Sequence, residues 1–230
     1  MRKQVDNAKY RQAKKERKGS GRRGNFADHV QSVEDMLQTN PFVQLVLQAK
    51  DKVPCVILHT DEQLQDIWRL CCSSPHGKST VLGFDKTYNL GDVHVTVCVF
   101  KHLAVTRNKS DECPIFVGPI FLHGNLDYET FRFFFQHLAS HLQDCPSQPV
   151  TGSDQEKAMC KAIATAFPAS SHLTCTRHMR GNAEDKLRDS IGVCDTHRRH
   201  VLEAIFGRNG LAEAGDGVLF DCRLQLAREA

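Results

Sequence analysis

Two aspartates stand at positions where strands are expected to end. Asp85 closes the apolar run 80–85, and Asp154 closes a short run directly before an expected helix. Carboxylate oxygens are hard ligands that suit Mg²⁺ or Mn²⁺. Two such ions can activate a water or a 3′-hydroxyl and stabilise the leaving oxygen of a phosphodiester. We therefore interpret Asp85 and Asp154 as candidate catalytic metal ligands.

Each aspartate also has a purely structural interpretation. The run Ser153 to Glu156 fits a helix capping box, with Ser153 as the cap and Glu156 reaching back. In that interpretation Ser153 already fills the cap position, which leaves Asp154 free for another role. Asp85 could serve as a turn residue before Lys86. Spacing alone leaves both alternatives open.

Two Cys-x-x-His pairs follow the second aspartate. The first is Cys175 with His178, and the second is Cys194 with His197. Cysteine and histidine ligate zinc, but the two pairs do not have finger spacing, and a helix between them should carry them apart. We therefore do not expect zinc here. We expect Cys175 to face the core and His178 to reach a metal-bound water, a phosphate or a carbonyl.

Hydrophobic periodicity predicts the elements that must position these side chains. The run 93–100 alternates with a period of two, which is typical of a strand, and 114–123 is a further extended run with Gly118-Pro119 marking a bulge or an edge. Residues 126–142 carry a helical stripe, as do residues 158–166. The first stripe comprises Tyr128, Phe131, Phe135, Leu138 and Leu142. A strand over 171–176 and helices over 184–191 and 197–207 follow.

This element order, β-β-β-α-β-α-β-α, predicts an α/β fold with a mixed sheet. Three strands joined by short loops form an antiparallel meander, and two helical crossovers then add parallel strands. That is the order of an RNase H-like core, in which the first strand is central and the fourth lies beside it. Asp85 and Asp154 would then meet at one sheet edge, with their carboxylates about 4–7 Å apart.

Charge divides the chain into a basic arm and a mildly acidic body. Residues 1–24 hold ten Lys/Arg and two acids, a net charge of +8, so the remaining residues carry −5. Such an arm cannot bury apolar surface, and we expect it to be disordered. It could bind DNA phosphates, act as a nuclear import signal or only aid solubility. The candidate DNA-binding residues are Lys14, Lys15, Arg17, Lys18, Arg22 and Arg23.

Three units are expected: the arm at 1–24, an N-terminal α/β subdomain at 25–78, with a helix near 26–37, and the core at 79–230. The N-terminus lacks the apolar region of a signal peptide, and no run reaches the length of a membrane helix. We therefore expect an intracellular protein without a membrane partner, and its ten cysteines to be reduced.

Four blocks in order resemble the catalytic domain of Mutator-like (MULE) DNA transposases: LGFDKTYNLGDVHVTV, GPIFLH, GSDQEKAMCKAIATAFP and CTRHMRGN. The resemblance covers roughly residues 25–215. It implies an RNase H-like core whose DDE triad binds Mg²⁺ or Mn²⁺. Asp85 matches the first acid, Asp154 matches the second, and Cys175 with His178 matches the family's Cys-x-x-His signature. DNA is the implied partner, and the implied place of action is the nucleus.

The sequence departs from this family in one respect. The family's third acid lies in a motif like Asn-Asn-x-x-Glu-Ser-x-Asn, and this sequence contains neither Asn-Asn nor Glu-Ser. We therefore expect an incomplete core, and a C-terminally truncated transposase whose ancestral chemistry is DNA strand cleavage and transfer. The alternatives are a domesticated or degenerate non-catalytic module that binds DNA or protein, and a zinc-stabilised regulatory domain. No small-molecule substrate is expected, and self-association stays open.

Overall fold

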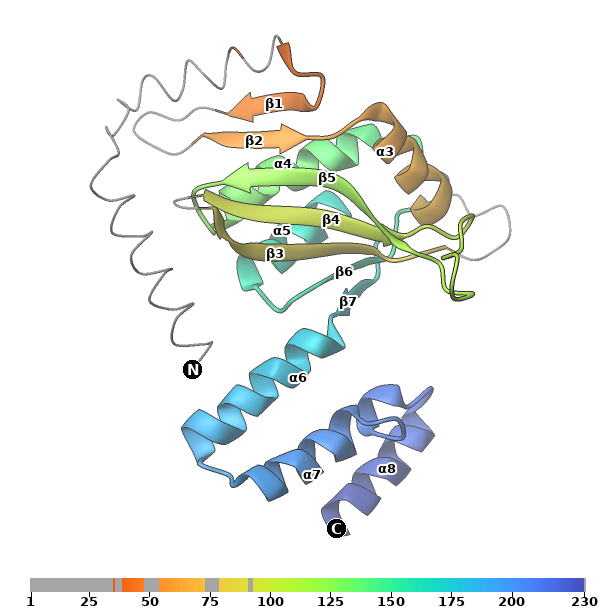
Figure 1. Cartoon of the computed structure of the whole chain (residues 1–230), viewed down its shortest axis with the longest axis vertical. Coiled ribbons are helices and arrows are strands. Elements are labelled where there is room, and N and C mark those ends of the chain that lie inside the picture. Colours follow the sequence, from red (N-terminus) through yellow and green to blue (C-terminus); the bar gives the residue numbers. More distant parts are fainter. Residues whose placement is uncertain (1–34, 36–38, 48–53, 73–78, 91–92, 230) are drawn as a thin grey trace, which may run out of the picture.

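The computed structural model describes residues 35, 39–47, 54–72, 79–90 and 93–229 (Figure 1). The basic arm and nearly all of the helix expected near residues 26–37 lie outside the described residues. The described part is a mixed α/β structure built on one seven-stranded sheet, which confirms the predicted α/β class with a mixed sheet. The strands are β1 (Val43–Leu47), β2 (Cys55–Leu58), β3 (Leu82–Leu90), β4 (Val93–Lys101), β5 (Ile115–His123), β6 (Thr151–Ser153) and β7 (His172–Thr174).

The sheet has the strand order β1-β2-β5-β4-β3-β6-β7. The pairs β3–β4, β4–β5, β2–β5 and β1–β2 are antiparallel, whereas β3–β6 and β6–β7 are parallel. The strand β3 therefore lies between β4 and β6, and β1 with β2 extend the same sheet beyond β5. Gly118 and Pro119 of β5 stand opposite Cys98 alone, because Val97 pairs with Ile120 and Val99 pairs with Val117. That irregularity is the predicted bulge.

The strand that carries Asp85 is longer than its sequence indicated. We expected it to end at Asp85 and a turn to follow, but β3 continues to Leu90. Asp85 pairs with Val97, and the ladder goes on through Lys86 with Thr96 and Thr87 with Val95. Pairing with the strongly alternating β4 thus keeps a polar segment extended. Asp85 is a mid-strand residue, and the prediction that it ends the strand was wrong.

Helices α4 (Tyr128–His141) and α5 (Lys157–Ala166) cover one face of the sheet (Figure 1). The predicted stripe of α4 is confirmed for its four buried members from Phe131 to Leu142, whereas Tyr128 is half-buried. Phe134 is also completely buried, and its ring stacks on Phe121 of β5 at a centroid distance of 5.0 Å. Phe84 of β3 packs edge-on against Phe135 at 4.8 Å. These aromatic contacts fix β3 and β5 against the helical layer.

Of the remaining helices, one precedes β3 in the sequence and the others follow β7. Helix α3 (Asp61–Ile67) begins with a capping box formed by Thr60 and Gln63 and passes into a π-helical turn over Trp68–Cys72. Beyond β7 the chain forms α6 (Thr176–Asp185), a π-helical turn (Lys186–Ile191), α7 (Asp195–Phe206), a short 3₁₀ turn (Leu211–Glu213) and α8 (Gly217–Glu229). Figure 1 shows that α6, α7 and α8 form a helical group next to the β7 edge of the sheet. No helix in the described segments combines the length and the apolar character that a membrane crossing requires.

Candidate functional site

The parallel pairing of β3 with β6 brings the two candidate acids to the same level of the sheet. Leu82 pairs with Thr151, and Gly83 pairs with Gly152. Asp85 follows Gly83 by two residues, and Asp154 follows Gly152 by two residues. Neighbouring strands lie about 4.8 Å apart, so the two backbones carry these residues side by side where β6 ends. Their carboxylate separation stays a prediction.

A cleft opens on the sheet face on which Asp85 lies. It is formed by the β3, β6 and β7 region together with the start of α6. The paired residues Gly83 and Gly152 line it, and valine side chains pack closely against them. A Cβ at Gly83 would come within 3.0 Å of a Val99 methyl, and one at Gly152 within 3.1 Å of a Val81 methyl. This part of the lining is therefore apolar.

The cleft also has polar groups, which come from β3 and from the first turn of α6. Asp85 Oδ1 lies 3.7 Å from His178 Nε2, with the two side chains 51% and 42% exposed. Arg177 lines the same cleft. The predicted Cys-x-x-His signature thus stands beside the first acid, because Cys175 is the N-cap of α6 and the helix turns His178 back toward β3. Cys175 is half-buried and lines the cleft, so the expectation that it faces the core was wrong.

The environment of Asp154 also differs from the expected capping box. Helix α5 has Glu156 at its N-cap, without a side-chain capping bond. Ser153 is buried, and its hydroxyl donates to the Asp154 carbonyl (2.8 Å) and contacts His172 Nε2 at 3.2 Å. It is Asp154 that acts locally on the helix entry, since its Oδ1 accepts a hydrogen bond from the Glu156 amide at 3.1 Å. Among the described residues Asp154 Oδ2 has no hydrogen bond, and it is open to a further ligand.

A salt bridge connects the same two segments on the helical side of the sheet. Lys86, next to Asp85, pairs with Glu156, and both side chains are largely buried. On a strand, adjacent residues point to opposite faces, so the side chains of Lys86 and Asp85 lie on opposite faces of the sheet. The pair links β3 to the segment that follows Asp154. It therefore stabilises the relative position of the two candidate acids without occupying the cleft.

Two nearby histidines of the sheet have lowered pKa values, the buried His123 and the half-buried His172. His123 Nδ1 donates to the Asn125 carbonyl at 2.7 Å, and its Nε2 lies 2.9 Å from Thr96 Oγ1. Burial lowers the pKa of His123, and the charges of His94 and Lys86 act in the same direction, against the Asn125 carbonyl and Glu156. His172 stands between Thr151 and Ser153, and burial lowers its pKa as well. Both rings have hydrogen-bond partners, and neither lines the cleft that holds Asp85, Arg177 and His178.

The two Cys-x-x-His pairs do not assemble into one group of close ligand atoms. Cys194 Sγ contacts His197 Nδ1 at 3.4 Å, at the start of α7. Across the described ranges, one set of three or more metal-ligating side chains has mutually close atoms, and it lies elsewhere, at His59, His137 and His141. The cysteines of the chain are free thiols, and those at 55, 71, 72 and 98 are buried.

The comparison with protein families matches this part of the chain to the MULE transposase domain, over residues 81–182. Residues 81–182 form a MULE transposase-like domain. Both acids, the cleft and the first Cys-x-x-His pair fall within it, and it spans less than half of the 230 residues. No curated protein matches the chain. The MULE domain supports a transposase-type function and suggests DNA as a partner.

Sequence reasoning passed over two residues of this region. Arg177 lies inside the Cys-x-x-His signature, and an arginine among candidate phosphate-binding residues was a readable signal. Lys86 directly follows Asp85, but its partner Glu156 is 70 residues away, and only the β3–β6 pairing brings them together. The arm residues Lys14 to Arg23 lie outside the described residues, so their predicted role stays a prediction.

Proposed function

We propose that the MULE domain of this chain is an RNase H-like core whose ancestral chemistry is divalent-metal-dependent DNA strand cleavage and transfer. The observation that carries the proposal is the parallel pairing of β3 with β6 inside the matched range, in which Asp85 and Asp154 each follow a paired glycine by two residues. The sheet order β5-β4-β3-β6-β7, with the first strand of the matched domain in the middle, supports the RNase H-like assignment.

The two acids offer a suitable donor set for Mg²⁺ or Mn²⁺. Asp85 is half-exposed and has one partner among the described side chains, His178 at a long 3.7 Å. Asp154 presents Oδ2 after Oδ1 has accepted the Glu156 amide. Hard oxygen ligands of this kind are what these ions prefer. The bound ion would activate a water or a 3′-hydroxyl and stabilise the leaving oxygen of the phosphodiester.

The residues around the acids have roles that follow from their chemistry. Arg177 lines the cleft and is suited to bind a phosphate of the DNA backbone. Its guanidinium can donate two parallel N–H hydrogen bonds to phosphate oxygens. His178 orients Asp85 and, in its protonated form, would contribute a second positive charge.

The family motif that carries the third acid of the DDE site is absent from this sequence. Two carboxylates leave the metal ions short of ligands, so we expect little strand transfer from this chain by itself. The lack of Asn-Asn and Glu-Ser in the sequence also favours a second candidate function, a non-catalytic module that binds DNA or protein. For the first function the proposed partner is DNA, with the basic arm as an additional contact and the nucleus as the place of action.

Titration of the full chain with Mn²⁺, followed by electron paramagnetic resonance of the free ion, tests the acid pair. We expect Asp85→Asn or Asp154→Asn each to weaken Mn²⁺ binding by about tenfold or more, since each removes one of the two carboxylates. Asp111→Asn, an exposed acid in the loop between β4 and β5, is the matched control and should bind like the unsubstituted chain.

The same preparations would be assayed for nicking of supercoiled DNA in Mn²⁺. Equal Mn²⁺ affinity in the two acid variants and the unsubstituted chain would refute the metal site. Strong nicking by the unsubstituted chain that Asp154→Asn abolishes would show that another acid of the chain replaces the family's third one. Mn²⁺ binding without nicking, together with DNA binding, is the result expected from an incomplete triad.

A further inference from the structure

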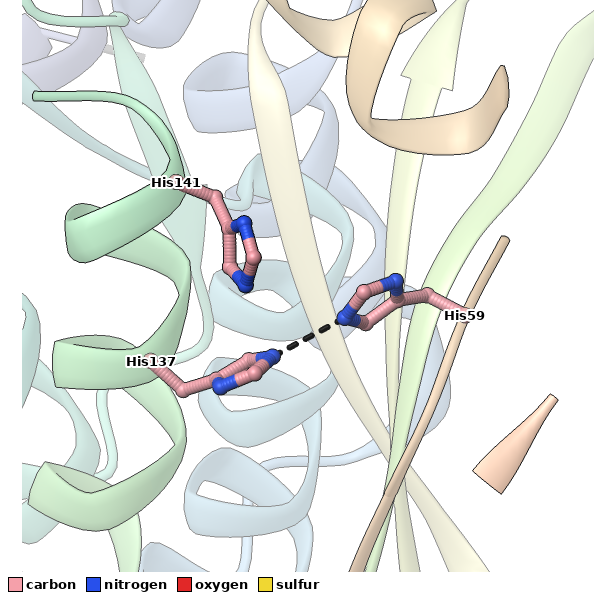
Figure 2. A group of neighbouring side chains, drawn as sticks. All are labelled: His59, His137 and His141. Atoms are coloured by element: carbon pink, nitrogen blue, oxygen red, sulfur yellow. Dashed lines mark hydrogen bonds between the residues drawn. The ribbon is translucent and has the colours of Figure 1, made fainter. Parts of the chain in front are cut away.

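Three histidines gather on elements other than those that carry the acid pair. His59 follows β2 directly, whereas His137 and His141 lie one turn apart on α4. Figure 2 shows the three rings turned toward a common point. One ring nitrogen from each lies within 4.8 Å of those of the other two, and the Nε2 atoms of His59 and His137 are 2.9 Å apart.

The local structure explains why these rings converge. Residues four apart on a helix project from the same face, so His137 and His141 form a pair of the kind that holds zinc on helices. The ring of His59 is 5.2 Å from that of His137 and 5.5 Å from that of His141, centroid to centroid. The third ligand therefore comes from the edge half of the sheet, at the point where α4 passes the end of β2.

The three nitrogens are close to the spacing that a metal ion requires. With zinc–nitrogen bonds of about 2.0–2.1 Å, tetrahedral ligands stand roughly 3.3 Å from one another. The observed separations range from 2.9 Å to below 4.8 Å, so small ring rotations would bring all three to an ion. Around the buried ring of His59, Nδ1 has no hydrogen-bond partner among the described residues, and the ring makes its polar contact through Nε2.

The charge state of the cluster also suits a cation. Burial lowers the pKa of His59, and the neighbouring His141 lowers it further. Burial, His141 and His59 together lower the pKa of His137 to about 4. Both rings are therefore neutral near pH 7, and neutral imidazole is the form that ligates metals.

The cluster is open to solvent on one side. His59 is buried, His137 is half-buried and His141 is exposed. His141 lines a groove together with Asp61, Gln65, Trp68 and Arg69 of the segment α3 to Cys72. A metal ion held by the three rings would thus have its fourth position facing this groove, which is the arrangement of a three-ligand site that keeps one position for water.

We propose that His59, His137 and His141 form a binding site for a first-row divalent transition metal such as Zn²⁺, separate from the carboxylate pair. Imidazole ligands select Zn²⁺ and its neighbours, whereas carboxylates select Mg²⁺ and Mn²⁺, so the two sites would differ in the ion they take. Because its ligands come from β2 and α4, the ion would tie the edge strands of the sheet to the helical layer.

Titration of the full chain with Zn²⁺ in excess Mg²⁺ measures the affinity of this site. A parallel titration with Co²⁺ shows, by the absorbance of the bound ion, whether nitrogen atoms coordinate it. We expect His137→Ala and His141→Ala each to weaken binding of the first equivalent by at least about 100-fold, more than the loss of an outer-sphere partner costs. His200→Ala, an exposed histidine on α7, is the control and should leave the first equivalent unchanged. Circular dichroism verifies that each variant is folded.

The ten cysteines make the comparison between variants essential, since thiolates also bind Zn²⁺. A Co²⁺ spectrum dominated by thiolate charge transfer, with affinity unchanged in both α4 variants, would overturn the proposal and assign the ion to cysteines. Displacement of the first equivalent by Mg²⁺ would overturn it as well, because it would place the ion on carboxylates. Retained Zn²⁺ binding in His200→Ala with loss in the two α4 variants supports it.

Discussion

Asp154, the second proposed metal ligand, also has a local structural role. Its Oδ1 accepts the Glu156 amide and so fixes the entry into α5. This anchoring holds the side chain at the end of β6 and leaves the second oxygen for a cation. The structural interpretation and the catalytic interpretation of this residue are thus compatible, although the sequence had presented them as alternatives. Asp85, in contrast, is positioned by its place in the middle of β3.

Buried neutral histidines make the stability of this molecule depend on pH. The pKa of His123 is lowered in the folded state, mainly by burial. Below pH 6.5, His123 therefore binds a proton in the unfolded chain but not in the folded chain. The free energy of unfolding thus falls as the pH falls from 6.5 toward the pKa of His123 in the folded state. For one proton the slope is at most about 1.4 kcal/mol per pH unit.

We predict that His123→Gln reduces this acid destabilisation, because glutamine keeps a donor and an acceptor but does not titrate. The measurement is the urea unfolding free energy at pH 7.5 and at pH 5.0, for the variant and for the unsubstituted chain. His200→Gln, at an exposed position, is the control and should keep the original pH dependence. An identical pH dependence in His123→Gln would show that His123 titrates alike in both states.

At the scale of elements, the strength of the sequence pattern decided what could be predicted. The strand β4 and the helices α4 and α5 were recovered because their apolar periods are regular, and burial of Met159, Ala162 and Ile163 confirms the stripe of α5. The end of β3 was missed, because residues 86–89 are mainly polar and pairing with β4 keeps the segment extended. The start of α6 at Thr176 was missed because the helix buries none of its residues and has no stripe to read.

In the candidate site, too, some residues could be predicted from the sequence and their long-range contacts could not. Asp85, Asp154 and the Cys-x-x-His pair could be named from the sequence, since local motifs carry them. The contact of His178 with Asp85, the link from Lys86 to Glu156 and the three-histidine cluster join residues that are 70 or more positions apart. Such pairs leave no local pattern. The spacing of His137 and His141 was the one signal for the cluster that the sequence did contain.

The aromatic layer between α4 and the sheet should supply much of the stability of the core. Phe134 is completely buried and stacks on Phe121, with an angle of 4° between the rings. We predict that Phe134→Ala lowers the free energy of unfolding by about 3–5 kcal/mol, the sum of lost transfer free energy and a residual cavity. Equilibrium urea denaturation, followed by circular dichroism, measures the loss.

The neighbouring Phe133 provides a control with the same chemical change. It is half-buried, and its ring centroid is 6.3 Å from that of Phe121, so Phe133→Ala should cost roughly 1–2 kcal/mol. Equal losses at the two positions would mean that the helix as a whole, and not the packed face of Phe134, determines the effect.

At the scale of the whole molecule, burial is concentrated in the sheet, in α4 and α5, and in the segment from α3 to Cys72. Within the helical group from α6 to α8, Leu202 is the one buried large apolar side chain among the described residues. Val218, Phe220 and Leu226 of α8 are exposed by 82%, 42% and 62%. Elements with few buried contacts open at lower free energy than the core. The first turn of α6, which carries Arg177 and His178, thus connects the rigid sheet to the less stable part of the molecule.

Charge is likewise distributed unevenly, with +8 on residues 1–24 and −5 on the rest. A body of net negative charge repels DNA at long range, so non-specific affinity must come from a local cation such as Arg177 or from the arm. Deleting residues 1–24 should therefore weaken non-specific DNA binding and flatten its salt dependence. Each phosphate contact contributes about 0.9 to the slope of log K against log[salt], so the arm accounts for up to about 7.

Fluorescence anisotropy of a labelled duplex, measured between low and physiological salt, gives this slope. The matched control is a chain in which the order of the first 24 residues is scrambled. It keeps their charge and removes any specific arrangement of the basic side chains. Counterion release depends on the number of neutralised phosphates, so the scrambled arm should restore the slope of the original chain. A slope that the deletion leaves unchanged would contradict the prediction and assign the arm to nuclear import or solubility. A slope restored by the original arm but not by the scrambled one would show that residues such as Lys14 and Arg17 bind in a defined arrangement.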